Sequence, residues 1–314
     1  MSLTQIIKDT QSPARQEMIE HCRRHYPRLS RPPLQCPSLV KGTEGIIGNS
    51  FDYLVKYFFK LNYPDLDIRF LSIEDFLRSG TVKNLDDFVF VGKYATSYEN
   101  AVLAKGLKES YLDSLRQGYP SEAFLIACYR MGQIENWRKS GMIYPLDLNT
   151  VDPENIRDLS NLYSLLKVED FPFKERIFLN PEFGKAGRLV RGAEADIILD
   201  DMLLEIKTVQ EFSFNLYIRL QLVGYLVLMR IEELEGTNNY GRINTIGVYH
   251  SRYGKFIKYP VNFIISDKKI TYLAEFFKKE YDYENRLRGK EVSYDYSTPM
   301  WDEIEYFNEQ ECQE

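Results

Sequence analysis

The chain has 314 residues, of which 44% are hydrophobic and 27% are charged, and its formal net charge is −6. Its 18 glycines and 13 prolines are too few for a collagen-like or low-complexity chain, so the composition is that of a globular protein with a sizeable core. The longest uncharged apolar stretch, Leu220–Met229, is much shorter than the ~20 residues that cross a bilayer, which argues against a membrane-spanning helix.

The amino end and the cysteines predict a cytoplasmic protein. The first residues, MSLTQIIKDTQSPARQ, contain no apolar core followed by a small-residue cleavage site, so we expect no export signal. The cysteines are too few and too scattered for a disulfide framework, which favours a reducing compartment. They are Cys22, Cys36, Cys128 and Cys312.

Charge is distributed unevenly along the chain. Residues 302–314 contain six acidic residues and no basic one, so this segment alone accounts for the net charge. Residues 1–41 contain seven Lys or Arg against three acids, and several prolines interrupt them. We therefore expect a basic, proline-punctuated arm over 1–41, in which a local basic surface is weighed against a merely solvated segment, and an acidic tail over 293–314.

The first half of the chain is mainly helical in its periodicity. A short helix is expected near Arg15–Arg24, and apolar residues spaced three and four apart predict a long amphipathic helix from about Thr43. Because no Gly/Ser linker follows, we expect residues 42–292 to form one domain with a helical elaboration over about 73–166. Its expected helices are Ile73–Arg78, Ser97–Gln117 and Ser121–Ser140.

The pattern changes after Pro172. Three apolar runs predict a β-meander: Arg176–Phe183, Leu189–Leu199 and Met202–Thr208. A helix, two strands and a closing helix are expected next, at Phe214–Leu234, Ile243–Tyr249, Lys255–Val261 and Ile270–Arg286. This order predicts an α/β (α+β) fold with a mixed central sheet flanked by helices.

Two carboxylates are predicted to face each other in this sheet. If Asp200-Asp201 is a two-residue hairpin turn, Leu199 lies opposite Met202, and the same register sets Asp196 opposite Glu205. Opposed like charges are destabilising unless something lies between them. Since both ligands are hard oxygen donors, we expect Mg²⁺ or Mn²⁺ at Asp196 and Glu205.

Lys207 lies two residues beyond Glu205, and therefore on the same face of the strand. Two carboxylates that hold a divalent cation beside a lysine suit phosphodiester hydrolysis, because the cation polarises the phosphate and the lysine stabilises negative charge or positions the nucleophile. The alternative is structural: a Glu194–Lys207 cross-strand ion pair, with Asp196 and Glu205 at exposed sheet ends.

These residues resemble a known signature. Asp196 followed by Glu205-Ile206-Lys207 resembles the PD-(D/E)xK nucleases, although Ala195 stands in place of the proline, and Gln221 and Tyr225 match the Q-x-x-x-Y motif of the RecB-like branch. The resemblance implies a restriction-endonuclease-like core in which Asp196, Glu205 and Lys207 are catalytic. It also implies that Gln221 and Tyr225 support the site and contact nucleic acid; the alternative is a Gln and a Tyr buried in the core.

The same branch usually carries G-x-x-x-H on an upstream helix, with the histidine as a metal ligand. Gly48 and Asp52 have this spacing, with aspartate in place of histidine. Asp52 is therefore predicted as a further metal ligand. The alternative is an ion pair with Lys56 at i, i+4. Arg252, near His250 at a strand end, is predicted to bind substrate phosphate, against the alternative of a surface turn.

The expected function is a metal-dependent nuclease that hydrolyses DNA, as an exonuclease or a structure-dependent endonuclease, with RNA as an open alternative. A catalytically silent nucleic-acid-binding or assembly module and a site-specific restriction endonuclease are the other readings. Some relatives bind an iron–sulfur cluster through four cysteines, but only Cys312 lies near the carboxyl end, so no cluster is expected. The G-x-x-x-x-G-K-[ST] loop is absent from the sequence, so no nucleotide is expected, and a helicase motor either comes from another chain or is absent. A protein partner that supplies a motor or the choice of target is an open expectation.

Overall fold

A computed structural model describes residues 2–64 except 24, 25 and 28, residues 109–140, residue 148 and residues 150–287. They belong to two compact units, residues 2–38 with 164–287, and residues 39–64 with 109–163. The expected helix at Ile73–Arg78 and the expected acidic tail at 293–314 lie outside the described residues. No described helix is long and apolar enough to cross a membrane.

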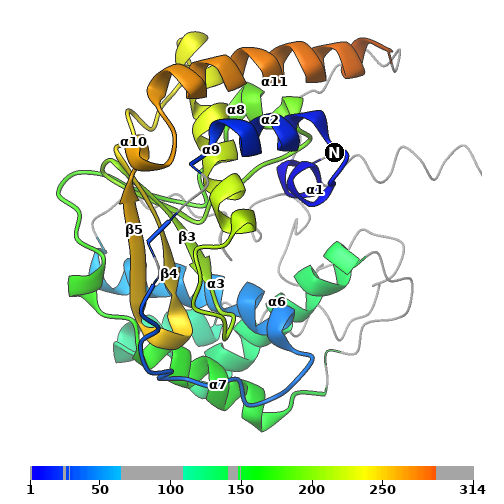
Figure 1. Ribbon diagram of the computed structural model, residues 1–314. Coiled ribbons are helices and arrows are strands. Elements are labelled where there is room, and N and C mark those ends of the chain that lie inside the picture. The colour runs from blue at the N-terminus through cyan, green and yellow to red at the C-terminus, as the bar shows by residue number, and fades with distance from the viewer. Residues whose placement is uncertain are drawn as a thin grey trace, which may run out of the picture. The chain divides into compact units, whose positions relative to one another are not determined.

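The first unit contains a five-stranded mixed sheet, as the sequence predicts (Figure 1). The strands lie in the order β1-β2-β3-β4-β5; β3 and β4 are parallel and the other neighbours are antiparallel. Their bounds are β1 Ile177–Leu179, β2 Ile197–Leu199, β3 Met202–Lys207, β4 Thr245–His250 and β5 Lys255–Pro260. Because β3 is central and parallel to β4, the chain must cross over between them, and a helix makes this crossover.

That crossover helix is α9 (Leu216–Leu234), which packs on β3 and β4 (Figure 1). Asn215 caps it by accepting a hydrogen bond from the Ile218 N–H at 3.1 Å. Leu203 belongs to the core shared with α9, so alternation sets Glu205 and Lys207 on the same face. After β5 come α10 (Val261–Ile264) and α11 (Asp267–Leu287), and α11 packs on α9. The unit also contains two short 3₁₀ helices, η1 (Val168–Asp170) before β1 and η2 (Ser251–Tyr253) between β4 and β5.

The amino-terminal residues are not a solvated arm, contrary to one reading of the sequence. They form α1 (Leu3–Lys8) and α2 (Pro13–His21), both of which pack against α9. Leu3, Ile6 and Met18 are buried in the same core as the sheet. Gly224 on α9 allows this approach, because a Cβ there would lie 2.8 Å from Leu3 Cδ1.

The expected meander is interrupted. A helix, α8 (Gly184–Leu189), lies where the sequence predicts a break between two strands, and it overlaps the strand expected over Leu189–Leu199 only at Leu189. Of that expected strand, only β2 forms. Ala186 and Val190 are buried, whereas Lys185 and Arg188 are exposed, which is the spacing of a helix.

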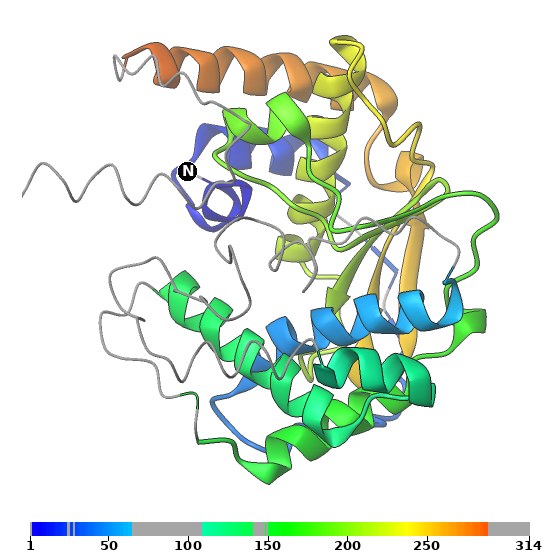
Figure 2. The ribbon, with the colours of Figure 1, turned by 180° about the vertical axis from the view of Figure 1, so that it is seen from behind.

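The second unit is helical (Figure 2). It contains α3 (Glu44–Asn62), a helix over 109–117, α6 (Glu122–Ser140) and α7 (Pro153–Ser164), and α3 packs on α6. Tyr57 and Phe124 lie at its centre, with ring centroids 5.0 Å apart. The described residues of 39–64 and 109–163 thus form a compact unit separate from the one that contains the sheet.

Candidate active site

The hairpin register predicted from the two-residue turn is confirmed. Leu199 pairs with Met202, and Ile197 pairs with Leu204. Asp200 has a φ of 50°, which aspartate tolerates better than most residues. The turn therefore sets which side chains of β3 point toward α9.

The Asp200 carboxylate binds the turn to the segment before β1. It accepts hydrogen bonds from the N–H groups of Arg176, Glu175 and Lys174 at 2.9, 3.0 and 2.7 Å. Burial opposes ionisation, but these donors outweigh it and hold the pKa of Asp200 below its ordinary value. Asp200 thus has a structural role.

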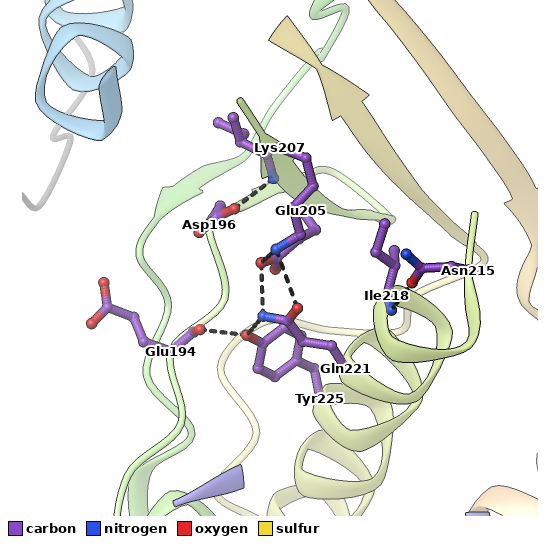
Figure 3. A network of polar contacts seen from close by, with 9 residues as sticks. Glu194, Asp196, Glu205, Lys207, Asn215, Ile218, Gln221 and Tyr225 are labelled. Carbon is purple, nitrogen blue, oxygen red and sulfur yellow. Dashed lines mark hydrogen bonds and ion pairs between the residues drawn. The ribbon is translucent and has the colours of Figure 1, made fainter. Parts of the chain in front are cut away.

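Glu205 is the centre of a polar cluster between β3 and α9 (Figure 3). Its side chain is almost completely buried, with the residue only 3% exposed. Oε1 accepts from Lys207 Nζ at 2.6 Å and from Gln221 Nε2 at 2.7 Å. Oε2 is buried and has no hydrogen-bond partner among the described residues. An acceptor left in this way carries a desolvation cost, and a bound cation offsets it.

Asp196 lies at the same end of the hairpin, immediately before β2. Regular pairing stops at Ile197, and the Asp196 Oδ2 atom accepts a hydrogen bond from the Ile206 N–H at 2.5 Å. The carboxylate therefore reaches across to β3 between Glu205 and Lys207. The two predicted ligands are brought to one end of the hairpin, although Asp196 does so outside the ladder.

The structural alternative of a Glu194–Lys207 ion pair is not observed. Glu194 forms an isolated antiparallel bridge with Glu182, and its side chain points away from the cluster (Figure 3). Lys207 forms its ion pair with Glu205. The chain leaves the hairpin register before Glu194, so a register extended from the turn does not hold there.

Lys207 is held in position by two acceptors. Its Nζ atom donates to Glu205 Oε1 at 2.6 Å and to Gln221 Oε1 at 3.3 Å, and its side chain is 20% exposed. Burial lowers the pKa of this lysine, but Glu205 and Asp196 raise it more, so the pKa is above its ordinary value. Lys207 is therefore an ammonium ion with limited solvent access.

Gln221 and Tyr225 share one face of α9, as their spacing predicts. Gln221 Nε2 donates to Glu205 Oε1 and, at 2.8 Å, to the Tyr225 hydroxyl, which in turn donates to the Glu194 carbonyl at 2.7 Å. Phe183 stacks on the Tyr225 ring at 5.2 Å. Burial, then the charges of Glu205 and Asp196, raise the pKa of Tyr225 well above its ordinary value, so it is a neutral donor.

Asp52 lies on α3, which belongs to the second unit, whereas the cluster around Glu205 belongs to the first unit. Its Oδ2 atom pairs with Lys56 Nζ at 2.8 Å, which is the ion pair that the sequence offered as the alternative. Its role as a metal ligand stays a prediction.

Arg252 and His250 occupy places that the sequence did not indicate, because both are completely buried. The Arg252 guanidinium donates to the carbonyls of Thr208 and Cys36, so the predicted contact with substrate phosphate is not supported. His250 Nε2 lies 3.0 Å from the Ser213 carbonyl, and its Nδ1 atom has no partner among the described residues. Burial lowers the pKa of His250 to about 4. The sign of this burial in the sequence is that His250 follows the apolar residues of β4.

Glu232 is a buried carboxylate that sequence reasoning missed. It accepts hydrogen bonds from the Ala186 N–H at 2.7 Å and from the Thr237 hydroxyl, one on each oxygen. It therefore caps the first turn of α8 from α9. A glutamate among the apolar residues of Leu226–Leu234 was the only sequence signal.

The residues present fit a hard divalent cation. Within the described part of the chain no three His, Cys, Asp or Glu residues gather closely enough to hold a metal. Two carboxylates, Asp196 and Glu205, do meet at the end of the hairpin, and one of their oxygens is buried without a donor. Mg²⁺ is usually bound by one or two carboxylates together with waters and phosphate oxygens, so this donor set is sufficient.

The chain was compared with protein-family models, with curated proteins and with solved structures, and none of them matches. Its function is therefore inferred from the chemistry of the cluster around Glu205.

Proposed function

We propose that this protein is a metal-dependent nuclease that hydrolyses phosphodiester bonds of DNA, with the restriction-endonuclease-like core and RecB-like motifs that its sequence resembles. The observation that carries the proposal is the Glu205 carboxylate. One oxygen is bound by Lys207 and Gln221, and the other is buried and has no donor among the described residues. Buried carboxylate oxygens in stable proteins normally have a hydrogen-bond donor or a ligand, so the second oxygen of Glu205 is explained by a bound ligand.

Asp196 and Glu205 are the residues that hold the cation in this proposal. The bound cation supplies Lewis acidity to the phosphate and lowers the pKa of a water molecule. The chain contributes fixed ligand positions, because the Ile206 N–H orients Asp196 and the Gln221 amide orients Glu205.

Lys207 stabilises the negative charge that develops on the phosphate. Its ammonium is held beside Glu205 by fixed acceptors, so little reorganisation is needed when charge appears. In this arrangement Lys207 acts as a cation and a hydrogen-bond donor, and not as the base that removes a proton from water.

Gln221 and Tyr225 are positioning residues. The Gln221 amide connects Lys207, Glu205 and Tyr225, and the Tyr225 hydroxyl ties the segment before Asp196 to α9 through the Glu194 carbonyl. Together they fix the relative positions of the two carboxylates and the lysine, on which in-line attack at phosphorus depends.

A cleavage assay tests the proposal. Wild-type protein is incubated with end-labelled linear duplex, single-stranded DNA and supercoiled circular DNA in Mg²⁺, Mn²⁺ or EDTA. We expect metal-dependent products that decrease at least about 100-fold in Lys207→Ala, because a charge-stabilising donor is lost. Lys258→Ala, on β5 of the same sheet, is the matched control and should cleave as wild type.

The substrates separate the kinds of nuclease. An exonuclease leaves closed circles intact, a structure-dependent endonuclease cuts at junctions or single-stranded regions, and a restriction enzyme cuts circles at defined positions. Absence of products from every substrate, with DNA binding retained, contradicts the proposal and leaves the catalytically silent binding module.

A further inference from the structure

A basic face lies on α8, outside the cluster around Glu205. Lys185, Arg188 and Arg191 are exposed and follow one another at three-residue spacing, whereas Ala186 and Val190 are buried. Lys185 and Arg188 lie three residues apart on one side of α8, and Arg191 follows two residues after the last residue of this helix. The segment from 183 to 193 contains no acidic residue, and no described carboxylate forms an ion pair with Lys185 or Arg191.

This face is carried by a firmly held element. α8 packs on α9, and the buried Glu232 carboxylate accepts the Ala186 N–H in its first turn. At its other end the Gly192 N–H donates to the Gly187 carbonyl at 2.9 Å, which closes the helix. The cations are therefore presented by fixed backbone rather than by a loop.

Arg191 has an unusual backbone conformation. Its φ is 50°, and the other described non-glycine residues with positive φ are Asn180 and Asp200, whose short polar side chains tolerate this region. At the end of a helix glycine is the usual residue in this conformation. An arginine there is strained, which is best explained if its side chain is needed in that place.

The basic face is connected directly to the candidate active site. Asp196 lies five positions after Arg191, so their Cα atoms lie at most about 18 Å apart. This reach corresponds to roughly five nucleotide steps of one strand at ~3.4 Å each. The Tyr225 hydroxyl bonds the Glu194 carbonyl within this segment, which fixes its path toward the cluster.

We infer that Lys185 and Arg191, with Arg188 between them, bind the phosphate backbone of the nucleic-acid substrate and direct the strand to Asp196 and Glu205. The inference rests on the proposed function for its substrate. Charge complementarity identifies the ligand, because the remainder of the chain is not basic overall and the segment from 183 to 193 contains three cations and no acidic residue.

The test is DNA binding without cleavage. The affinity of the full-length protein for a fluorescent single strand and for a duplex is measured by anisotropy in EDTA, over a series of NaCl concentrations. We expect Arg191→Gly and Lys185→Ala each to weaken binding about three- to tenfold at 50 mM NaCl, and to reduce the slope of log K against log[salt] by about 0.7–0.9. Arg191→Lys keeps the charge and should retain both values.

Folding is monitored with the same proteins. Glycine suits the conformation of residue 191, so Arg191→Gly should unfold within about 2 °C of wild type, and loss of binding cannot then be attributed to loss of structure. Lys268→Ala, on the exposed surface of α11, is the control for removal of one positive charge. It should leave affinity and salt slope unchanged.

The outcomes are distinct from those of the cleavage assay. If Arg191→Gly and Lys185→Ala bind DNA like wild type with an unchanged salt slope, the inference is wrong, whether or not the protein cleaves. If both variants lose affinity while no protein shows metal-dependent products, the basic face is supported and the nuclease proposal fails.

Discussion

Two buried glutamates in the first unit differ in how their oxygens are used. Glu205 is 3% exposed and Glu232 is 6% exposed, so solvent is nearly absent from both. Each oxygen of Glu232 accepts one hydrogen bond, from the Ala186 N–H and from the Thr237 hydroxyl. In Glu205 one oxygen receives two donors and the other receives none from the described residues.

This difference in donors distinguishes a structural carboxylate from a carboxylate that is available to a ligand. A buried carboxylate whose oxygens are both bonded contributes to stability, and Glu232 does so by anchoring α8 at its positively polarised end. A carboxylate with one bare oxygen costs stability and keeps an acceptor for a ligand. Burial alone therefore does not distinguish the two glutamates, whereas the donors that each oxygen receives do.

The largest expected difference is in catalysis. Glu205→Gln removes the charge of the bare oxygen at constant shape, and we expect metal-dependent cleavage to fall at least about 1,000-fold, equivalent to about 4 kcal/mol. Glu232→Gln should remain within about threefold of wild type per folded molecule. Single-turnover rates on linear DNA measure both, and equal losses in the two variants would remove the distinction.

The next effect concerns acidic pH and His250, another buried group with an unpartnered atom. Burial lowers its pKa in the folded protein to about 4, below the ~6.5 of an unfolded chain. Between these two pKa values the unfolded chain binds more protons than the folded protein. The stability that depends on a neutral His250 is therefore complete above about pH 6.5 and is lost as the pH falls toward 4. We expect a loss of roughly 2–3 kcal/mol across this window.

Urea unfolding at a series of pH values measures this loss. His250→Gln keeps a donor for the Ser213 carbonyl but cannot titrate, so its stability should show a smaller slope between pH 6.5 and 4. A slope equal to that of wild type would show that other groups cause the acid sensitivity.

Stability should separate the two glutamates in the opposite sense to activity. Glu232→Gln replaces charge-assisted hydrogen bonds by neutral ones and should lower the free energy of unfolding by about 2 kcal/mol. In Glu205→Gln the lost attraction to Lys207 is offset by relief of a half-bonded buried charge, so the change should stay within about 1 kcal/mol. Urea denaturation in EDTA measures the free energy of unfolding of both variants. The prediction is wrong if Glu205→Gln is the less stable of the two.

The smallest expected effect is stabilisation by the metal. At ten times its dissociation constant a divalent cation that binds only the folded state adds about 1.4 kcal/mol. Thermal unfolding of wild type should therefore shift upward by a few degrees in Mg²⁺ or Mn²⁺. Glu205→Gln should show much less shift, and Glu232→Gln should show the wild-type shift from its own lower midpoint. An equal shift in all three would place the cation elsewhere.

Much of the sheet was predictable because its signals are local. The turn at Asp200-Asp201 and the two-residue alternation around it define the pairing of Leu199 with Met202, and the structure confirms it. The helix at 184–189 was missed because its six residues include Gly184 and Gly187, which are typical of a break between strands. Glu194 lies beyond that helix, so the extended register was wrong for it.

Less of the environment of the site was predictable. Asp196, Glu205 and Lys207 were selected from the hairpin register, and Gln221 and Tyr225 from the motif that the sequence resembles. The structure brings all five into one network. Arg252 was predicted to contact substrate, but it bonds the carbonyl of Cys36 from a segment more than 200 residues away along the chain. Such contacts between distant segments leave no local pattern.

The sequence by itself therefore determined the order of the strands, the hairpin register and the face that Glu205 and Lys207 share, since period and turn length depend only on near neighbours. Tertiary structure decided that α1 and α2 cover α9 and that His250 is buried. It also decided which oxygen of Glu205 lacks a donor, because hydrogen-bond partners come from segments that only folding brings together.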